Sequence, residues 1–371
     1  MSFFFSLIPA ILVLGILIII HEFGHFIACR LTHVKVEKFS IGFGPEIFHW
    51  QGKETRYAVS LFPLGGFVKP AGESVSETGP EGPKPGDYLA APLLARIFIV
   101  VAGVGMNYIL AFLLFAAIFM MGRPVPGTVI NGFVEGYPAK TSGFLMGDRI
   151  VQIQGQDVST WTQMTQALDA APEGEIEILV ERKSEGVAAI LSLRITPRLE
   201  VLSDLFGEQA RVKRLGVTPH PQAQEYERFG LMESLAKAWQ TSVMLTVLTH
   251  KALFYLATGR LSVKNMQGPI GIITMAGTAA QLGISYVLQL AANLSISLAV
   301  FNLLPVPALD GGHLLFLLIE AIRRKRVSLE VQERATQVGF ALLLMLMGVI
   351  IYNDLANLNV FEKVKDIFIK P

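Results

Sequence analysis

The chain has 371 residues, of which 52% are hydrophobic and only 16% are charged, and its mean hydropathy is +0.50. Soluble domains carry about 25% charged residues on average, so this composition predicts an integral membrane protein. The net charge of +1, without a basic stripe interleaved with aromatic residues, gives no support for nucleic-acid binding. The single cysteine, Cys29, excludes an internal disulfide framework and a cysteine-based zinc finger.

The first apolar segment runs directly into a metal-binding pattern. Residues 3–20 are nearly all apolar, and as a helix they would rise about 27 Å, close to the hydrocarbon thickness of a bilayer. The sequence HEFGH follows without a break at 21–25. On a helix, His21 and His25 share one face and can reach one metal ion, while Glu22 can act as a base on a metal-bound water. The alternative is a chance grouping in a helix, but ionisable groups in an apolar span are costly and indicate function.

Two kinds of N-terminal processing would change this interpretation. A signal peptide needs basic residues before its apolar run, and residues 1–6 contain none. Residues 26–29 loosely resemble a lipoprotein cleavage box, which would make Cys29 the first residue of the mature protein and discard the HEFGH sequence. We expect instead that the first apolar segment is retained as a membrane span.

A β-hairpin and a second span follow the first one. Residues 55–69 alternate in polarity and then reach turn signals at Pro63 and at Gly65-Gly66, which predicts a hairpin with unusually apolar strands. Residues 93–121 are apolar enough to cross a membrane. They contain a small-residue stretch, Gly103 to Asn107, where small side chains permit close helix contact and the amide can bond to a neighbouring helix.

The composition then becomes that of a soluble domain, predicted at 127–200. Short β-branched runs bracket one helix-like segment, Trp161 to Ala170. The sequence Gly143 to Ile150, followed by Gly155 and Trp161, resembles the PDZ pattern of bacterial envelope proteases. PDZ domains bind peptides by adding a strand to a sheet edge. The alternative is an unspecialised small β-domain.

The second half of the membrane core contains two further predicted spans, 284–304 and 338–352. Residues 231–256 are helical but mixed in polarity, so we expect an amphipathic helix at the interface or against the bundle rather than a span. Residues 301–313 contain two prolines and two glycines, which rule out a regular helix before residues 314–322. Irregular backbone at membrane depth is tolerated only when it is buried in protein or lines a cavity.

Basic residues orient the predicted spans. The cluster at 323–326, between the third and fourth spans, should face the cytoplasm, and Arg30, Lys35 and Lys38 after the first span agree. Counting spans then places both termini and the PDZ-like domain outside. The predicted fold is a polytopic α-helical membrane protein with about four transmembrane helices, a membrane-associated β-hairpin and an inserted PDZ-like α+β domain. Its predicted parts are a first membrane half at 1–126, the PDZ-like domain at 127–200, a linker at 201–230 and a second membrane half at 231–371.

Two histidines are too few for a catalytic zinc, which usually takes three protein ligands and water. Cys29 lies one turn beyond His25, but three ligands along one straight helix spread over about 12 Å, too far to converge on one ion. Asp310 is favoured because it lies in the irregular, cavity-lining segment at matching depth. Zinc is chosen over iron or cobalt from the ligand types alone. The other candidates by residue type are His33, Glu37, Glu46 and His313.

Two distant motifs together resemble one known family. The sequences HEFGH and FNLLPVPALDGGH, the small-residue stretch at 103–107 and one PDZ-like domain are similar to those of the site-2 protease family, M50-like zinc metalloproteases. Within that family they look like the RseP-type regulated intramembrane metalloproteases of bacteria. The resemblance covers essentially the whole chain, including Gly268-Pro269-Ile270. Relatives in enteric bacteria carry two tandem PDZ domains, whereas the space here holds one, which puts a two-PDZ substrate filter in doubt.

The resemblance implies a zinc endopeptidase of the bacterial inner membrane. Its substrates would be single-span proteins, such as anti-sigma-factor-like proteins or remnant signal peptides, after a first cut by a site-1-type protease. The 55–69 hairpin would pair with the substrate. By role, the implied residues are His21, His25 and Asp310 as zinc ligands, Glu22 as general base, and Asn302, Pro305 and Pro307 as the loop that holds unwound substrate.

Other classes of function make different predictions. A metal or solute transporter usually shows internal repeats with interrupted helices in both halves, and no such repeat is found in this sequence. A catalytically inactive scaffold would be expected to lack Glu22 or a ligand, and all are present. For the PDZ-like domain two roles stay open: binding a new C-terminus left by an earlier cut, or excluding substrates that still carry their outer domain.

Overall fold

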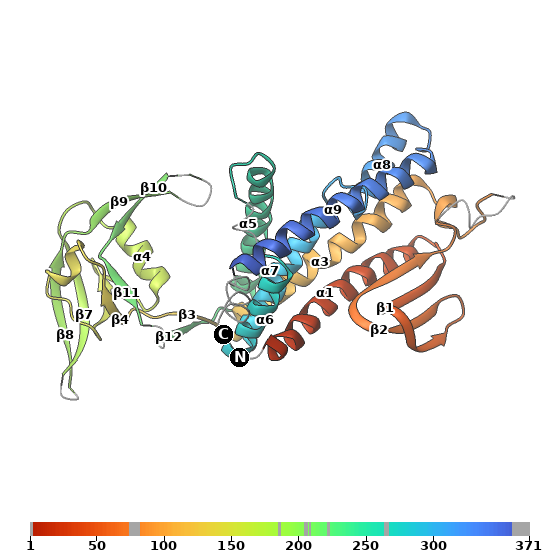
Figure 1. Cartoon of the computed structure of the whole chain (residues 1–371). Helices are drawn as coiled ribbons and strands as arrows, with labels where there is room; N and C mark the ends of the chain where they lie inside the picture. The colour runs from red at the N-terminus through yellow and green to blue at the C-terminus, as the bar shows by residue number, and fades with distance from the viewer. Residues whose placement is uncertain are drawn as a thin grey trace, which may run out of the picture. The chain divides into compact units, whose positions relative to one another are not determined.

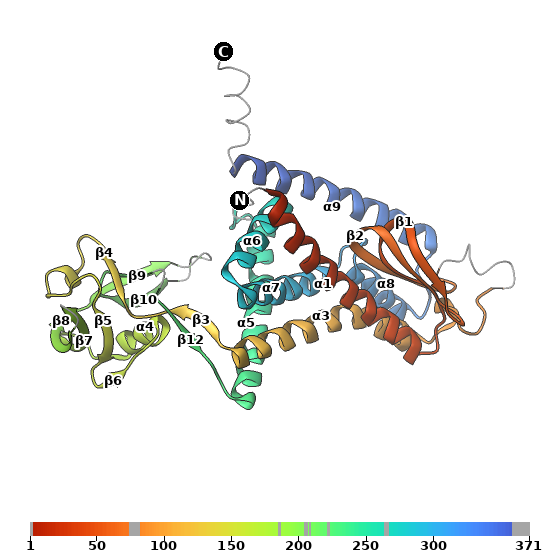
Figure 2. The same ribbon diagram turned by 90° about the horizontal axis from the view of Figure 1, so that it is seen from below.

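The computed structural model describes residues 3–73, 82–184, 187–203, 207, 209–220, 223–262 and 267–357 (Figures 1 and 2). The chain forms two compact units. One combines residues 1–118 with 231–371, and the other comprises residues 119–230. The soluble-type sequence is therefore an insertion between the two halves of a helical unit.

Among the described residues, four helices of the helical unit are long and apolar enough to cross a membrane, as predicted. The helix α5 (Leu231–Ala257) is not among them, because Glu233, Lys237 and Lys251 interrupt its apolar sequence. A shorter apolar helix that the sequence had not indicated, α6 (Pro269–Leu282), precedes the third span. The four candidate spans are α1 (Phe3–Leu31), α3 (Leu93–Met121), α7 (Ile284–Asn302) and α9 (Leu329–Asn357).

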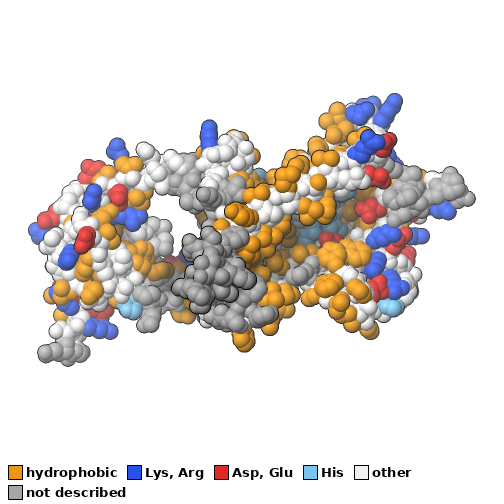
Figure 3. All heavy atoms as spheres, viewed as in Figure 1, with side chains coloured by type: hydrophobic (Ala, Val, Ile, Leu, Met, Phe, Trp, Pro, Cys, Tyr) orange, Lys and Arg blue, Asp and Glu red, His pale blue; other side chains and the backbone are white. Residues whose placement is uncertain are grey.

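The surface of α9 fits a hydrocarbon environment. Figure 3 shows hydrophobic side chains along its visible length, and Lys and Arg side chains beyond the C-terminal end of α8 (Asp310–Arg323). A helix that exposes apolar side chains over most of its circumference is stable in lipid rather than in water. The exposed apolar residues of α9 include Val338, Phe340, Leu342, Leu344, Met345 and Val349.

The helices α1, α3 and α7 share one apolar core. Val13 and Leu17 of α1 are buried against Leu110 and Leu114 of α3 and against Ala291 of α7. Farther toward the N-terminus of α1, small alanine side chains of α1 and α6 pack together. This packing fixes α1 against α3, and the HEFGH sequence lies in the same helix.

The segment between α7 and α8 is irregular, as its prolines and glycines predicted, but it is shorter than expected. The helix α8 begins at Asp310, four residues before the predicted start at 314. An acidic residue in the first turn of a helix is favourable. Gly311 is also required there, because a Cβ at this position would lie 2.2 Å from the carbonyl oxygen of Leu304. The loop therefore folds back onto the start of α8 and places Asp310 at the helix N-terminus.

The predicted 55–69 hairpin is wrong in its pairing. The strand β2 (Arg56–Pro70) has no internal hairpin turn and pairs with β1 (Val36–Gln51), which the sequence had not indicated. Residues 38–41 lie between 56–59 on one side and 66–69 on the other. Both strands are therefore bent, and four segments form one curled sheet beside the C-terminal half of α1 (Figures 1 and 2). The short helix η1 (Tyr88–Ala90) follows.

The inserted unit is larger than the predicted 127–200 domain, because 201–230 is not a simple linker. Its strands β11 (Val217–Pro219) and β12 (Gln224–Glu227) return to pair with β4 (Ile130–Phe133) and β3 (Arg123–Pro126). A hairpin of β9 (Arg198–Ser203) and β10 (Gln209–Arg214) precedes them. The main sheet has the strand order β6 (Gln156–Asp157), β5 (Arg149–Ile153), β7 (Ile176–Ser184) and β8 (Val187–Ile195). The unit also contains the helices η2 (Pro138–Lys140) and α4 (Trp161–Ala170).

The core of the inserted unit lies between α4 and these strands. Phe144, Ile150, Met164, Ile178 and Leu215 are nearly inaccessible within it. A capping box between Thr160 and Gln163 fixes the start of α4.

Candidate metal centre

The three predicted ligands come together from two distant segments. His21 and His25 project from α1, and Asp310 projects from the N-terminus of α8. The distance from Asp310 Oδ2 is 3.0 Å to His21 Nε2 and 3.4 Å to His25 Nε2, and the two Nε2 atoms are 3.2 Å apart. Zinc bonds of about 2.0–2.1 Å at tetrahedral angles place donor atoms about 3.3 Å apart. The donor set and its spacing therefore fit a zinc ion.

The helix α3 orients the second imidazole. His25 Nδ1 donates a hydrogen bond to the carbonyl oxygen of Ile99 at 2.8 Å, which leaves the Nε2 lone pair for a metal. Gly24 and Gly103 allow α1 and α3 to approach closely. A Cβ on Gly24 would lie 2.4 Å from the Ala102 carbonyl oxygen, and one on Gly103 would lie 2.2 Å from His25 Nε2. The small residues of α3 are therefore part of the ligand geometry.

We expect Gly103→Ala to weaken zinc binding at least about tenfold, because the added methyl group occupies the position of the His25 ring and packed interiors cannot absorb such an overlap. Gly105→Ala is the matched control on the same helix, since its Cβ would have no heavy atom within 4 Å. Both substitutions replace glycine by alanine and stabilise the helix by up to about 1 kcal/mol, so this effect cancels when the two variants are compared. Competition with a chromophoric chelator measures the affinities. Equal affinity in the two variants would contradict this geometry.

Glu22 is held beside the cluster by the β-sheet. Its Oε2 accepts a hydrogen bond from the Val68 N–H of β2 at 3.1 Å. Gly66 approaches it as well, because a Cβ there would lie 3.7 Å from Glu22 Cγ. The Glu22 carboxylate is therefore held in place by β2 and lies next to the metal cluster, but it is not one of the three clustered ligand residues.

Of the three predicted substrate-binding residues, Asn302 lies at the metal cluster. Its Nδ2 atom is 3.4 Å from His21 Nε2. Pro305 is exposed in the loop, and the backbone of Pro307 lies against Gly312 and against Gly339 of α9. The structure thus brings one of the three to the cluster, and a role in holding substrate stays a prediction for all three.

The alternative ligands lie elsewhere. Cys29 is buried in an apolar cluster with Val34, Val36 and Ile99. Glu46 pairs with Lys38 and Arg56, which lower its pKa to about 2, with the Arg56 hydrogen bond as the largest cause. Among the described residues, the metal cluster contains only the three predicted ligands. Glu37 pairs with Lys69, and His33 lies outside the cluster.

Sequence reasoning gave no metal-site role to Asn107. Its side-chain amide lies 3.3 Å from His21 Nδ1, the ring nitrogen that is not in the cluster. Gly103 and Asn107 are four residues apart, so on a helix they share one face. In the structure this face packs against the two histidines, with Gly103 next to His25 and Asn107 next to His21. The sequence alone could not indicate that this face meets the histidines.

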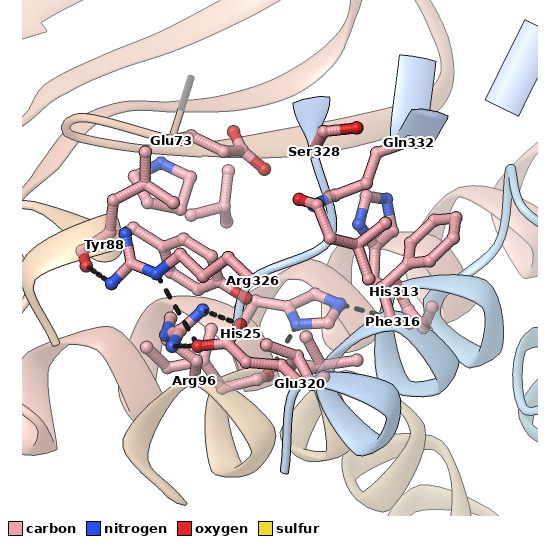
Figure 4. A pocket seen from close by; sticks show the side chains of 18 of the residues that line it. His25, Glu73, Tyr88, Arg96, His313, Phe316, Glu320, Arg326, Ser328 and Gln332 are labelled. Atoms are coloured by element: carbon pink, nitrogen blue, oxygen red, sulfur yellow. Dashed lines mark hydrogen bonds and ion pairs between the residues drawn. The ribbon is translucent and has the colours of Figure 1, made fainter. Parts of the chain in front are cut away.

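A cavity of about 450 Å³ extends from the cluster toward the other end of α8. Glu22, His25 and Asp310 are among the residues that line it. Figure 4 shows His25 and His313 facing it, with Arg96, Glu320 and Arg326 along one side. Burial lowers the pKa of His313, which favours its neutral form.

A buried ion pair connects α3 to α8 at this cavity. The guanidinium of Arg96 donates to both carboxylate oxygens of Glu320, at 3.0 and 2.6 Å, and lowers the pKa of Glu320. Arg326 lies 3.6 Å from the same carboxylate and also donates to the carbonyl oxygen of Leu89. Since breaking a buried pair leaves an uncompensated charge, this pair holds α8 firmly in place.

Comparisons with known proteins agree with this arrangement. A family model described as Peptidase family M50 matches residues 9–346. A Rhizobium meliloti protein is 34% identical over 362 residues, covering 94% of this chain and 96% of its own length. A Campylobacter jejuni protein is 34% identical over 351 residues, covering 95% and 93%. A Vibrio cholerae protein is 31% identical over 456 aligned positions, covering 95% and 99%. All three bear the name "Putative zinc metalloprotease".

Proposed function

The chain belongs to peptidase family M50, and from this membership we propose that it is an intramembrane zinc metalloprotease of the site-2 type. One observation carries the proposal: two imidazoles from a candidate membrane span and the Asp310 carboxylate lie at zinc-ligand spacing, with Glu22 beside them. The proposed ligands are His21, His25 and Asp310. A zinc ion bound there would lower the pKa of a water molecule and polarise a substrate carbonyl.

Glu22 is the proposed general base. It accepts a proton from the attacking water and delivers it to the leaving nitrogen, so one carboxylate serves both steps. The Val68 N–H bond holds this carboxylate on the cavity side of α1. The Ile99 carbonyl orients the His25 imidazole from α3.

A substrate segment would have to unwind, because the peptide bonds of a helix are shielded by their own hydrogen bonds. The curled sheet offers partners for an extended segment. Residues 66–69 pair with 38–41 on one side, and the other side faces Glu22. An extended substrate placed along this edge would recover backbone hydrogen bonds near the metal. Asn302, Pro305 and Pro307 are proposed to hold the other side of the extended substrate.

The sheet is also the proposed membrane-associated element. Its exposed aromatic and aliphatic residues suit contact with the acyl-chain boundary of a bilayer. Together with the basic cluster at 323–326, this supports a cytoplasmic-side position for the active site and an outer position for the inserted unit. The exposed residues are Phe43, Ile47, Phe48, Trp50, Leu61 and Phe62.

We place the protein in the bacterial inner membrane, where it acts in regulated intramembrane proteolysis. Its proposed substrates are single-span proteins, anti-sigma-factor-like proteins or remnant signal peptides, that a site-1-type protease has cut first. The narrow cavity supports this order, since a volume of about 450 Å³ admits a short extended segment but no folded domain.

The inserted unit is proposed to be a single PDZ domain that binds peptide C-termini. A groove of about 350 Å³ lies between α4 and residues 212–217, and Trp161, Met164 and Leu168 line its helix side. The groove continues into β11, so a bound peptide can add a strand there. This groove favours capture of a new C-terminus over simple exclusion of bulky substrates.

Removal of residues 127–223 tests that role. Pro126 and Gln224 are partners across β3 and β12, so an Asn-Gly turn can join them without disturbing the helical unit. We expect cleavage of a pre-cut substrate to fall roughly ten- to hundredfold at low substrate concentration, because one of two binding sites is lost. Intact substrate should stay uncleaved. Efficient cleavage of intact substrate by the shortened protein would support exclusion instead.

The proposed activity is tested with purified protein in detergent and a tagged single-span peptide. We expect cleavage inside the apolar segment, its loss with a zinc chelator, and its return on addition of zinc. Zinc binding without cleavage would indicate an inactive scaffold. Zinc-dependent uptake of metal or solute into proteoliposomes, without cleavage, would indicate a transporter.

A further inference from the structure

Asn107 contacts His21 at Nδ1, the ring nitrogen that is not part of the metal cluster. The residue lies on α3 and is completely buried. Its side-chain amide lies 3.3 Å from His21 Nδ1, and its backbone carbonyl accepts the hydroxyl of Ser295 on α7 at 2.8 Å. The Oδ1 atom of Asn107 is buried and has no hydrogen-bond partner among the described residues. A buried amide oxygen without a hydrogen-bond partner is destabilising, so this side chain has an unused acceptor beside His21.

The chemistry of a ligating imidazole supplies the missing donor. A histidine that binds metal through Nε2 carries its remaining proton on Nδ1, and that N–H almost always donates to a fixed acceptor. For His25 the acceptor is the Ile99 carbonyl. For His21 the partner of Nδ1, within the part of the chain that the structure describes, is the Asn107 amide.

We propose that Asn107 is the positioning residue for His21, with its Oδ1 atom accepting the Nδ1 proton so that Nε2 is free to bind zinc. The proposal rests on the proposed zinc site. A half-turn of the amide about its last side-chain bond exchanges Oδ1 and Nδ2 at the same place. With Nδ2 toward Nδ1, the ring proton resides on Nε2, which lies 3.0 Å from Asp310 Oδ2, and Nε2 has no lone pair for a metal. With Oδ1 toward Nδ1, Nε2 is a metal ligand.

This pairing distinguishes a positioning role from simple packing. Aspartate is nearly the same size as asparagine, and its carboxylate can only accept, so Asn107→Asp preserves the bond to the Nδ1 proton. Asn107→Ala removes the acceptor and leaves a small void. A packing role predicts the opposite order, because burying an ionised carboxylate between apolar helices is more costly than losing a few atoms.

The experiment compares zinc affinity, by chelator competition, in the purified full-length protein and its variants. We expect Asn107→Ala to bind zinc about 10- to 100-fold more weakly than the unchanged protein, the usual effect of losing an outer hydrogen-bond partner. Asn107→Asp should bind within about threefold or more tightly, because the acceptor is kept. Ser295→Ala is the control, because it removes a hydrogen bond to the Asn107 backbone without touching the acceptor.

The outcomes separate this inference from the proposed function. If the unchanged protein binds no zinc, the zinc site itself is wrong. If it binds zinc and Asn107→Ala binds within about threefold of it, Asn107 does not position His21. Thermal unfolding of each metal-free variant, followed by circular dichroism, reports folding. If Asn107→Ala does not fold, the test rests on Asn107→Asp. The proposal is overturned if Asn107→Asp binds zinc more than about tenfold more weakly than the unchanged protein, or if Asn107→Asp does not fold.

Discussion

Glu22→Gln should leave zinc bound at the wild-type stoichiometry and lower cleavage of a single-span substrate by about 10²–10⁴-fold, the usual contribution of general acid–base catalysis. Glutamine keeps the size of the side chain and places an amide next to the Val68 N–H. It cannot accept the proton of the attacking water. Because Glu22 is not one of the clustered ligand residues, the metal site should be unaffected.

The measurement pairs zinc content by atomic emission with cleavage of a tagged peptide in detergent. Glu37→Gln is a suitable control, since it changes a carboxylate that pairs with Lys69 at the sheet surface and is outside the metal cluster. Cleavage by the Glu22 variant at a near wild-type rate would show that another group acts as the base. Loss of zinc together with cleavage would mean that Glu22 shapes the metal site instead.

The spans and the motif residues could be predicted because their signals are local. A run of apolar residues long enough for a bilayer is visible without a partner, and α1, α3, α7 and α9 match the predicted spans. The spacing of His21 and His25 is likewise a property of one helix. Asp310 was predictable by elimination, since among carboxylates in the membrane halves it alone follows an irregular segment at the right depth.

The β-sheet was mispredicted because its pairing is long-range. Gly65-Gly66 and Pro63 are strong turn signals, yet both lie inside β2. The register is set instead by Ser40, which is buried and bonds to Ser60, and by pairing of 38–41 with two separate parts of β2. A strand that lies between two others cannot be recognised from the alternation of either neighbour alone.

The same limit explains the domain boundary and the ion pair. Residues 201–230 look like a charged linker, but two short strands within them, β11 and β12, pair with strands much earlier in the chain. Val217 of β11, for example, lies opposite Phe133 of β4. Arg96 and Glu320 are separated by 224 positions. In each case the signal is a contact between segments whose own sequences are ordinary, so only the folded chain reveals it.

Asp310→Asn should reduce zinc affinity by at least about a hundredfold, because loss of a direct ligand costs more than the roughly 10–100-fold loss that follows removal of an outer hydrogen-bond partner. An amide oxygen is neutral and a poor replacement for a carboxylate on zinc. Asp310 Oδ2 lies 3.0 Å from His21 Nε2 and 3.4 Å from His25 Nε2, so it is close enough to both nitrogens to bind the same ion. Cleavage should fall with zinc occupancy.

The control for this prediction lies one turn along the same helix. His313 also faces the cavity but is not in the donor cluster, so His313→Gln should retain zinc within a few-fold. Thermal unfolding supplies a measure independent of activity, since a ligand that binds the folded state raises the midpoint in step with its affinity. Zinc should raise the midpoint of the unchanged protein and of His313→Gln, and leave Asp310→Asn unmoved. An equal rise in all three would remove Asp310 from the ligand set and would reopen the choice of third ligand among the residues that line the cavity.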